Sequence, residues 1–215
     1  VSLNFLIVAS ETPSERETRR QSAGASSDES YATTLQAVVP GCLTQTVSCV
    51  DEAGAERTVD LAAFDAIFFS GSPIQMHSKK SETQWAVAFM RAAFASQVPI
   101  FGSCAGMQIA SVAAGGTSKP RQPRMEAAFV RRITRTREGE HHPLLRGRPA
   151  SWDALAMHSD EVCDLPQGGV VLAGTSTTPV QAIEIRHNGG IFWGVQYHPE
   201  LSLAEIAQSL RRQKD

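Results

Sequence analysis

The stretch Val98-Pro99-Ile100-Phe101-Gly102-Ser103-Cys104-Ala105-Gly106 decides the fold. Its apolar first half predicts a buried strand, and residues 107–114 predict a helix that ends at Gly115-Gly116. A strand that turns directly into a helix forces the residue at the junction, Cys104, into a strained and exposed turn called a nucleophile elbow. Glycines flank such an elbow because the backbones crowd there. The stretch therefore predicts an α/β fold with a reactive thiol at a strand end.

The same alternation of strands and helices extends through the first half of the chain. Beyond residue 117 the pattern changes to short strand-like pieces, followed by an amphipathic helix over 205–212. The predicted earlier elements are strands over 3–9, 43–50 and 66–69 and helices over 31–39 and 82–97, and the later strands lie at 127–134, 153–157, 170–173, 180–185 and 191–197. This order predicts an open, mostly parallel, flavodoxin-like sheet flanked by helices, with a β-rich C-terminal part. We expect residues 1–215 to form a single domain.

Residues 10–29 interrupt this order with a long polar stretch, rich in Ser, Glu, Arg and Thr. Such a length of polar chain is unusual inside a compact domain unless it is functional or mobile. We expect it to be a loop that reaches over the active site.

Composition excludes several classes of function. The chain has 215 residues and a formal charge of -2, which offers no overall attraction for nucleic acid or anionic lipid. No apolar run approaches the length of a membrane span, and the four cysteines form neither a CxxC pair nor a Cys/His cluster with zinc spacing. We therefore expect a cytoplasmic protein with free thiols that needs no metal and no cofactor. Basic residues recur over 119–137; we interpret them as a solvated face, with an anion site as the alternative.

A second motif supplies an imidazole and a carboxylate. Gly194-Val195-Gln196-Tyr197-His198-Pro199-Glu200 ends a predicted strand, and positions two apart on a strand share a face. Pro199 ends the ladder, so His198 and Glu200 should lie at the carboxyl edge of the sheet, where open α/β folds place their sites. The pattern predicts that Cys104 is a nucleophile, His198 its base and Glu200 the group that orients the base. Each motif alone also fits a structural cysteine or a solvated histidine.

A third motif, Ser70-Gly71-Ser72-Pro73, follows another buried strand. A glycine there can direct its N–H toward a ligand, and Ala105 is the residue directly after the candidate nucleophile. We expect the N–H groups of Gly71 and Ala105 to form an oxyanion hole. Taken alone, the Gly-Ser-Pro sequence also fits a simple turn.

Together these motifs resemble the class I (triad) glutamine amidotransferases, above all the amidotransferase domain of GMP synthases and its stand-alone relatives. The resemblance rests on residues 68–73, 102–108 and 194–200, in family order along almost the whole chain. It implies the class I amidotransferase fold and a Cys-His-Glu triad. It also implies that the substrate-binding residues include Ser72, Gln108, Met157, His158 and Ser159.

The sequence departs from the family pattern at three places. Ser103 and Ala105, beside the nucleophile, replace residues that the family usually has larger, and we expect them to widen the floor of the pocket. Met157 stands where relatives often have a small polar residue, and residues 11–30 do not follow the family closely. These departures predict weak use of free glutamine and favour a bulkier γ-glutamyl compound.

The function predicted from the sequence is hydrolysis of the γ-amide of glutamine through a thioester at Cys104, releasing ammonia and glutamate. No phosphate-binding GxxxxGK[ST] loop is present to activate an acceptor, so a separate synthetase subunit is a candidate partner. Two alternatives stay open: a γ-glutamyl peptidase or transferase that acts on a larger γ-glutamyl compound, and a non-catalytic binding module with the same fold. The sequence does not give the oligomeric state.

Overall fold

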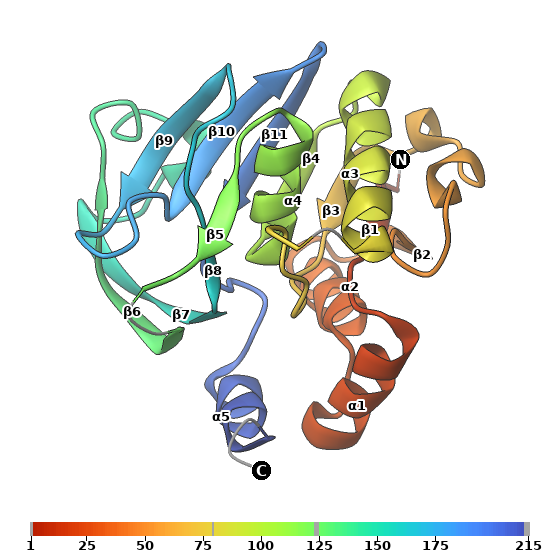
Figure 1. Cartoon of the computed structure of the whole chain (residues 1–215), viewed down its shortest axis with the longest axis horizontal. Helices are drawn as coiled ribbons and strands as arrows, with labels where there is room; N and C mark the ends of the chain where they lie inside the picture. The colour runs from red at the N-terminus through yellow and green to blue at the C-terminus, as the bar shows by residue number, and fades with distance from the viewer. Residues whose placement is uncertain (1, 79, 123–124, 213–215) are drawn as a thin grey trace.

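A nine-stranded mixed sheet forms the centre of the computed structural model, which describes residues 2–78, 80–122 and 125–212 (Figure 1). Its strand order is β2-β1-β3-β4-β11-β10-β9-β6-β7, and a small sheet pairs β5 with β8. The strands are β1 Asn4–Ala9, β2 Leu43–Ser48, β3 Ala66–Phe69, β4 Ile100–Ser103, β5 Ser118–Pro120, β6 Glu126–Arg135, β7 Ser151–His158, β8 Asp160–Val162, β9 Gly169–Gly174, β10 Ala182–His187 and β11 Gly190–Val195. The helices are α1 Pro13–Ala23, α2 Ser27–Val38, α3 Ser81–Ser96, α4 Ala105–Ala113 and α5 Leu203–Arg212, with short 3-10 turns at Ala55–Arg57, Leu61–Ala63 and Pro143–Leu145.

The parallel half of the sheet carries the main core. Strands β2, β1, β3, β4 and β11 run parallel, whereas β10, β9, β6 and β7 continue the sheet in antiparallel pairs. Leu6, Ile7 and Val8 of β1 have no exposed surface, as a continuous apolar run in a central parallel strand should. The predicted α/β class, the largely parallel first half and the β-rich C-terminal part are confirmed.

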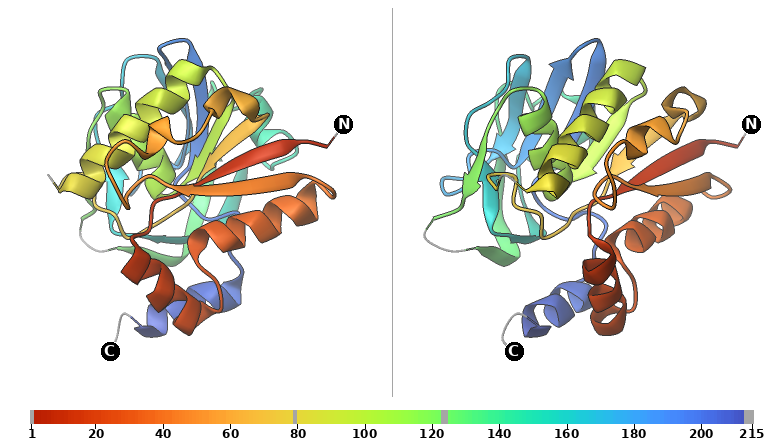
Figure 2. Two further views of the ribbon diagram at one scale, coloured as in Figure 1. Left: turned by 90° about the vertical axis from the view of Figure 1, so that its right-hand side faces the viewer. Right: turned by 45° about the vertical axis from the view of Figure 1, so that its right-hand side comes forward.

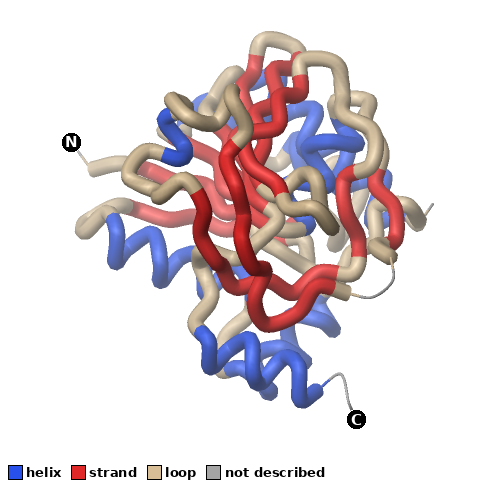
Figure 3. The backbone as a smooth tube through the Cα atoms, turned by 90° about the vertical axis from the view of Figure 1, so that its left-hand side faces the viewer, coloured by secondary structure: helices blue, strands red, loops and turns tan. Residues whose placement is uncertain are grey.

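Helices cover both faces of the parallel half. Figure 1 shows α3 and α4 in front of the sheet, and Figure 2 shows α2 on the opposite face, beneath β1 and β2. Figure 3, which faces the C-terminal half, shows its long antiparallel strands lying open on that side. Because β1, β3, β4 and β11 run parallel, their carboxyl ends share one edge, and α1 and α5 lie beyond that edge (Figure 1).

The expected loop over residues 10–29 is wrong, because this segment contains α1 and the start of α2. Thr12 and Glu15 form a capping box, Pro13 occupies the first turn, and Gly24 ends the helix in the left-handed conformation with φ 85°. Ser26 and Glu29 form a second capping box for α2. These caps satisfy the free N–H groups at the helix starts, which lets a largely polar segment remain helical.

Smaller differences concern element ends. The strand expected over 98–101 is β4, which begins at Ile100 and continues through Gly102 to Ser103, so the strand runs directly up to Cys104. The short strands β5 and β8 were not predicted, since three residues are too few to show a periodicity.

Candidate active site

Cys104 lies at the junction between β4 and α4 and adopts φ 50° and ψ -109°. A non-glycine residue rarely occupies a positive φ, so the conformation is strained. It is held by the Cys104 N–H, which donates to the Val195 carbonyl of β11 at 2.8 Å. A Cβ on Gly106 would lie 2.7 Å from the Phe69 carbonyl oxygen, so only glycine fits there. This is the elbow geometry expected from the sequence.

His198 and Glu200 lie directly after β11, the neighbour of β4 in the sheet. The Nδ1 of His198 is 2.7 Å from Oε1 of Glu200, and both side chains are buried. Burial by itself would lower the pKa of His198, but attraction by Glu200 and then by Cys104 outweighs it and raises that pKa well above its usual value. The arrangement therefore favours the imidazolium form of His198 beside Glu200. As the structure stands, the Cys104 thiol is 3.7 Å from the Met157 carbonyl oxygen, to which it donates.

Two residues behind Glu200 were not anticipated from the sequence. The Ser103 hydroxyl donates to Oε1 of Glu200 at 2.9 Å, and the Tyr31 hydroxyl of α2 donates to Ser103 Oγ at 2.6 Å. All three side chains are buried, and Oε2 of Glu200 has no hydrogen-bond partner among the described residues. The position of Glu200 thus depends on the hydrogen bonds of its Oε1 to Ser103 and His198. The sequence feature that could have indicated this contact is Ser103 itself, a polar residue at the end of a buried strand.

The expectation that Ser103 and Ala105 widen the pocket floor is wrong. Neither lines the pocket: Ser103 faces Glu200, and Ala105 is packed inside with 1% of its surface exposed. For Ser103 the strand direction decides this, since successive side chains alternate between the two faces of β4. Ala105 is the first residue of α4 and is buried there.

Gly71 lies against both reactive side chains. A Cβ added to it would be 2.8 Å from Cε1 of His198 and 3.5 Å from Cβ of Cys104. Among the described residues, no hydrogen bond is donated by the N–H groups of Gly71 and Ala105, so both are free to donate to a charged oxygen. This supports the oxyanion hole predicted for these two residues.

A cavity of about 310 Å³ opens over Cys104. Its size is at the lower end of the range for small-molecule sites. It brings together the expected substrate-binding residues, because Ser72, Gln108, Met157, His158 and Ser159 all line it beside Cys104, Gly71 and His198. Glu11 and Arg19 also line it, and the sequence did not indicate either residue.

The imidazole of His158 is fully engaged in a buried network. Its Nδ1 is 2.9 Å from the Asp160 carbonyl and its Nε2 is 2.9 Å from Oε2 of Glu126. The Asp160 carboxylate instead pairs with Nδ1 of His77 at 2.6 Å. Gln108 donates to the Asp160 carbonyl at 2.9 Å. These contacts fix the part of the pocket wall formed by residues 158–160 and give His158 a role in holding that wall.

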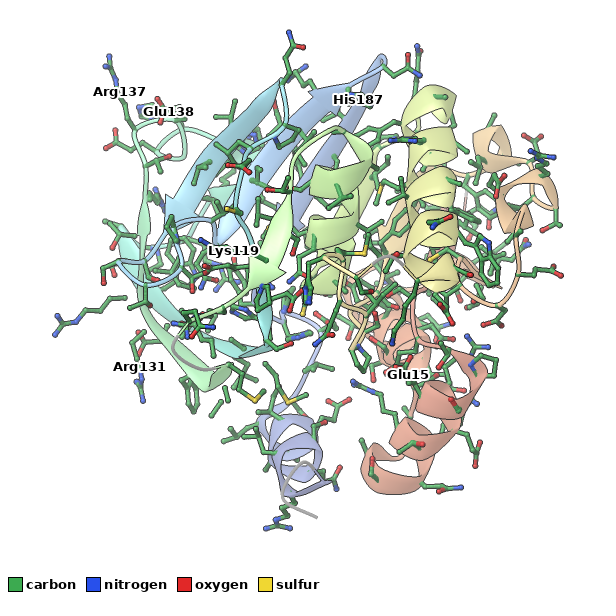
Figure 4. All side chains as sticks on the ribbon, in the orientation of Figure 1. Glu15, Lys119, Arg131, Arg137, Glu138 and His187 are labelled. Carbon is green, nitrogen blue, oxygen red and sulfur yellow. The ribbon has the colours of Figure 1, made fainter. Side chains whose placement is uncertain are left out.

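Within the described residues, no group of three or more His, Cys, Asp or Glu side chains is placed to hold a metal ion. The basic residues Lys119, Arg131 and Arg137 lie well apart, and Arg131 and Arg137 point outward (Figure 4). The expected solvated face fits these three residues but not Arg121, whose side chain is largely buried with Nη2 at 3.6 Å from Oε1 of Glu126. Positions 123 and 124 of this stretch lie outside the described residues. None of the helices in the described part of the chain has the length and apolarity to cross a membrane.

Comparisons with known proteins agree with this geometry. The family model "Glutamine amidotransferase class-I" matches residues 30–214. A γ-glutamyl-L-1-hydroxyisopropylamide hydrolase from a Pseudomonas species is 34% identical over 212 residues, which is 97% of this chain and 71% of that protein. A glutamine-hydrolyzing GMP synthase subunit from Ignicoccus hospitalis is 30% identical over 146 residues, 68% of this chain and 72% of that protein. A glutamine amidotransferase structure from Thermotoga maritima superposes with a TM-score of 0.72 at 11% identity, covering 100% of this chain and 84% of that one.

Proposed function

Since this chain belongs to the class I glutamine amidotransferase family, we propose that it is an enzyme that hydrolyses an N-substituted γ-glutamyl amide through a thioester at Cys104. The observation that carries the proposal is the placement of Cys104, His198 and Gly71 around one cavity, with Glu200 behind His198. The hydrolase and transferase chemistry of the family requires a nucleophile, a base and an oxyanion site in that arrangement.

The first half-reaction forms the thioester. The Cys104 sulfur attacks the γ-carbonyl carbon, and the carbonyl oxygen takes up negative charge between the N–H groups of Gly71 and Ala105. The carbon–nitrogen bond then breaks while the imidazolium of His198 gives its proton to the leaving amine. Glu200 holds the imidazole through Nδ1 and stabilises its charged form.

The second half-reaction returns the enzyme to its starting state. Water attacks the thioester carbon, His198 takes the proton of that water, and the carbon–sulfur bond breaks to release glutamate and the thiolate. The same oxyanion site stabilises the second tetrahedral intermediate. No atom other than those of the amide and one water is consumed.

The choice of an N-substituted amide over free glutamine is supported by the N-terminal helix. The family model begins at residue 30, whereas the match to the Pseudomonas hydrolase covers 97% of the chain and so includes α1. That helix and the residue before Thr12 contribute Arg19 and Glu11 to the cavity. They add polar side chains to the cavity that the part of the chain matched by the family model does not supply.

Use of glutamine with a separate synthetase subunit is the second candidate function, favoured by the similarity to the glutamine-hydrolyzing GMP synthase subunit. The two candidates are distinguished by steady-state kinetics. We expect kcat/KM for γ-glutamyl hydroxyisopropylamide to exceed that for glutamine by at least about tenfold, and Cys104→Ser to abolish both reactions. Mass spectrometry of a reaction quenched early should find one glutamyl group on the Cys104 peptide. Equal or better use of glutamine, or an active Cys104→Ser variant, would contradict the proposal.

A further inference from the structure

Two oppositely charged side chains line the candidate active site without neutralising each other. Arg19 on α1 is 7% exposed and Glu11 is 3% exposed, and both line the cavity above Cys104. They form no ion pair with each other in the structure, although the charge of Arg19 acts on Glu11. Buried charges are ordinarily paired or hydrogen-bonded, so both have binding capacity left for a ligand.

The guanidinium group of Arg19 forms fewer hydrogen bonds than it can donate. Its Nε donates to the Ala25 carbonyl at 3.2 Å, while Nη2 has no hydrogen-bond partner among the described residues. The carboxylate it approaches is Glu205 on α5, at 3.9 Å, which is too long for a hydrogen bond. The contact between α1 and α5 thus holds Arg19 in place without satisfying it.

Only one of the two carboxylate oxygens of Glu11 accepts a hydrogen bond. Its Oε2 accepts from the Ser27 N–H at 2.9 Å, and Oε1 takes part in no hydrogen bond within the described residues. Burial is the main influence on this carboxyl group and raises its pKa, against the opposing effects of Ser27 and Arg19. A hydrogen-bond donor from a ligand would therefore stabilise it.

The position of this pair relative to His198 indicates which part of a substrate it meets. In the proposed reaction His198 protonates the leaving amine, so the substituent on that nitrogen extends on the His198 side of the sulfur. Leu201, three residues beyond His198, lines the cavity together with Glu11 and Arg19. Gln108 and Ser159 line the cavity beside Asp160; the amide nitrogen of Gln108 already donates to Asp160 and Gln196, so its Oε1 and the Ser159 hydroxyl are the groups that would hold the glutamyl part.

The unused hydrogen-bonding atoms of the pair select the chemistry of the substituent. Within the described part of the chain, Nη2 of Arg19 is a free donor, and Oε1 of Glu11 is a free acceptor. A carboxylate on the leaving amine could accept from Arg19 but could not donate to Glu11, and an ammonium group could donate to Glu11 but could not accept from Arg19. A hydroxyl group carries no charge, accepts from a guanidinium and donates to a carboxylate.

We infer that Arg19 and Glu11 form the recognition site for the leaving amine, and that this site takes a short amine carrying one uncharged hydroxyl group. The inference rests on the proposed function, because it requires an N-substituted amide to be cleaved at Cys104. It makes Arg19 and Glu11 specificity-determining residues for the substituent, separate from the residues that perform the reaction.

The test is a matched series of γ-glutamyl amides of a branched amine. The four compounds differ in one group on the same carbon: methyl, hydroxymethyl, carboxylate or aminomethyl. We expect the hydroxymethyl compound to exceed the methyl compound in kcat/KM by about tenfold or more, as hydrogen bonds to charged partners allow. The carboxylate and aminomethyl compounds should both be poorer than the hydroxymethyl compound.

Variants assign the preference to the two side chains. Arg19→Met should reduce the hydroxymethyl-to-methyl ratio in kcat/KM to within about threefold, and its urea unfolding midpoint, compared with that of the wild type, serves as the reference for folding. Glu11→Gln should improve the carboxylate compound relative to the hydroxymethyl compound, because one negative charge is gone. Arg20→Met removes the same charge from the neighbouring exposed position on α1 and should leave every ratio unchanged.

Two results separate failure of this inference from failure of the proposed function. An unchanged ratio in Arg19→Met, or a wild-type preference for the carboxylate or aminomethyl compound, would overturn the assignment of Arg19 and Glu11 while leaving γ-glutamyl amide hydrolysis intact. Turnover of glutamine with none of the four amides cleaved would overturn the proposed function, and the inference with it.

Discussion

Replacing Ser103 by alanine tests whether the hydrogen bonds behind Glu200 position the base. Ser103 donates to Oε1 of Glu200 at 2.9 Å and accepts from Tyr31 at 2.6 Å, and neither side chain reaches solvent. Burial raises the pKa of Tyr31 well above its usual value, so its hydroxyl remains a donor at any ordinary pH. Ser103→Ala therefore removes a hydrogen bond to a carboxylate and leaves the Tyr31 hydroxyl without its acceptor.

The magnitudes follow from the type of each bond. A hydrogen bond to a charged group contributes about 1.5–3 kcal/mol, and a buried donor left unsatisfied costs about 1–3 kcal/mol. We expect Ser103→Ala to lower the free energy of unfolding by about 3–4 kcal/mol, since the two effects share one site. Tyr31→Phe removes a neutral bond only and should cost about 1 kcal/mol.

The double variant isolates the contact between the two residues. Because phenylalanine has no hydroxyl to leave unsatisfied, Tyr31→Phe made in the Ser103→Ala background should restore about 1–3 kcal/mol, whereas alone it costs about 1 kcal/mol, which gives a coupling energy of about 2–4 kcal/mol. Urea unfolding of the wild type, both single variants and the double variant provides this cycle. The kcat of Ser103→Ala should fall about tenfold with little change in KM, because Glu200 Oε1 then holds His198 alone.

Two outcomes would refute this reasoning. If Ser103→Ala were no less stable than Tyr31→Phe, the bond to Glu200 would contribute nothing. If stability fell as expected but kcat stayed at the wild-type value, the contacts would be structural and would not position the base.

Three further predictions concern the site itself. Gly71→Ala should lower kcat by about a hundredfold or more, because the new Cβ would stand 2.8 Å from Cε1 of His198 and would displace the base or the oxyanion N–H, an effect as large as the loss of one oxyanion donor; a fully active variant would contradict the close contact. An electrophilic glutamine analogue should label Cys104 and not Cys49, whose pKa is raised to about 12 by burial, and peptide mapping that found both labelled in the folded protein would be inconsistent with this. The stabilising effect of the Glu200 carboxylate on the imidazolium of His198 is present in full below the unfolded pKa of about 6.5 and is lost as pH rises through the raised folded pKa. The difference in free energy of unfolding between wild type and Glu200→Gln should therefore narrow from pH 6.5 upward when unfolding is measured at several pH values. A difference that widened with pH would contradict the stabilisation of the imidazolium by Glu200.

The arrangement of the sheet could be predicted because its signals are local. Residues 66–69 form β3 as expected, and the strand, elbow and helix around Cys104 follow from one apolar run, two glycines and a helical pattern. The shared carboxyl edge then places His198 near Cys104 without any knowledge of side chains.

The parts that escaped prediction depend on capping and on long-range contacts. α1 is polar throughout, so hydrophobic periodicity does not reveal it, although Thr12-Pro13-Ser14-Glu15 contains a complete helix-start signal. The bond between Tyr31 and Ser103 joins residues 72 positions apart, and its existence depends on how α2 packs on the sheet. Arg19 likewise reaches the cavity only because of how a helix packs, and the apolar pattern did not indicate that this helix, α1, exists.

In the assignment proposed above, the packing of α1 against α5 separates substrate choice from reaction chemistry. Arg19 and Glu205, which face each other across that contact, lie outside the sheet that carries Cys104 and the strand end at His198. Changes to the two helices can therefore alter which amine is accepted without disturbing the thioester machinery. A chain of this design can diversify among γ-glutamyl amides by drift in a short N-terminal helix, and the same helix is where a directed-evolution library for new amines would best be placed.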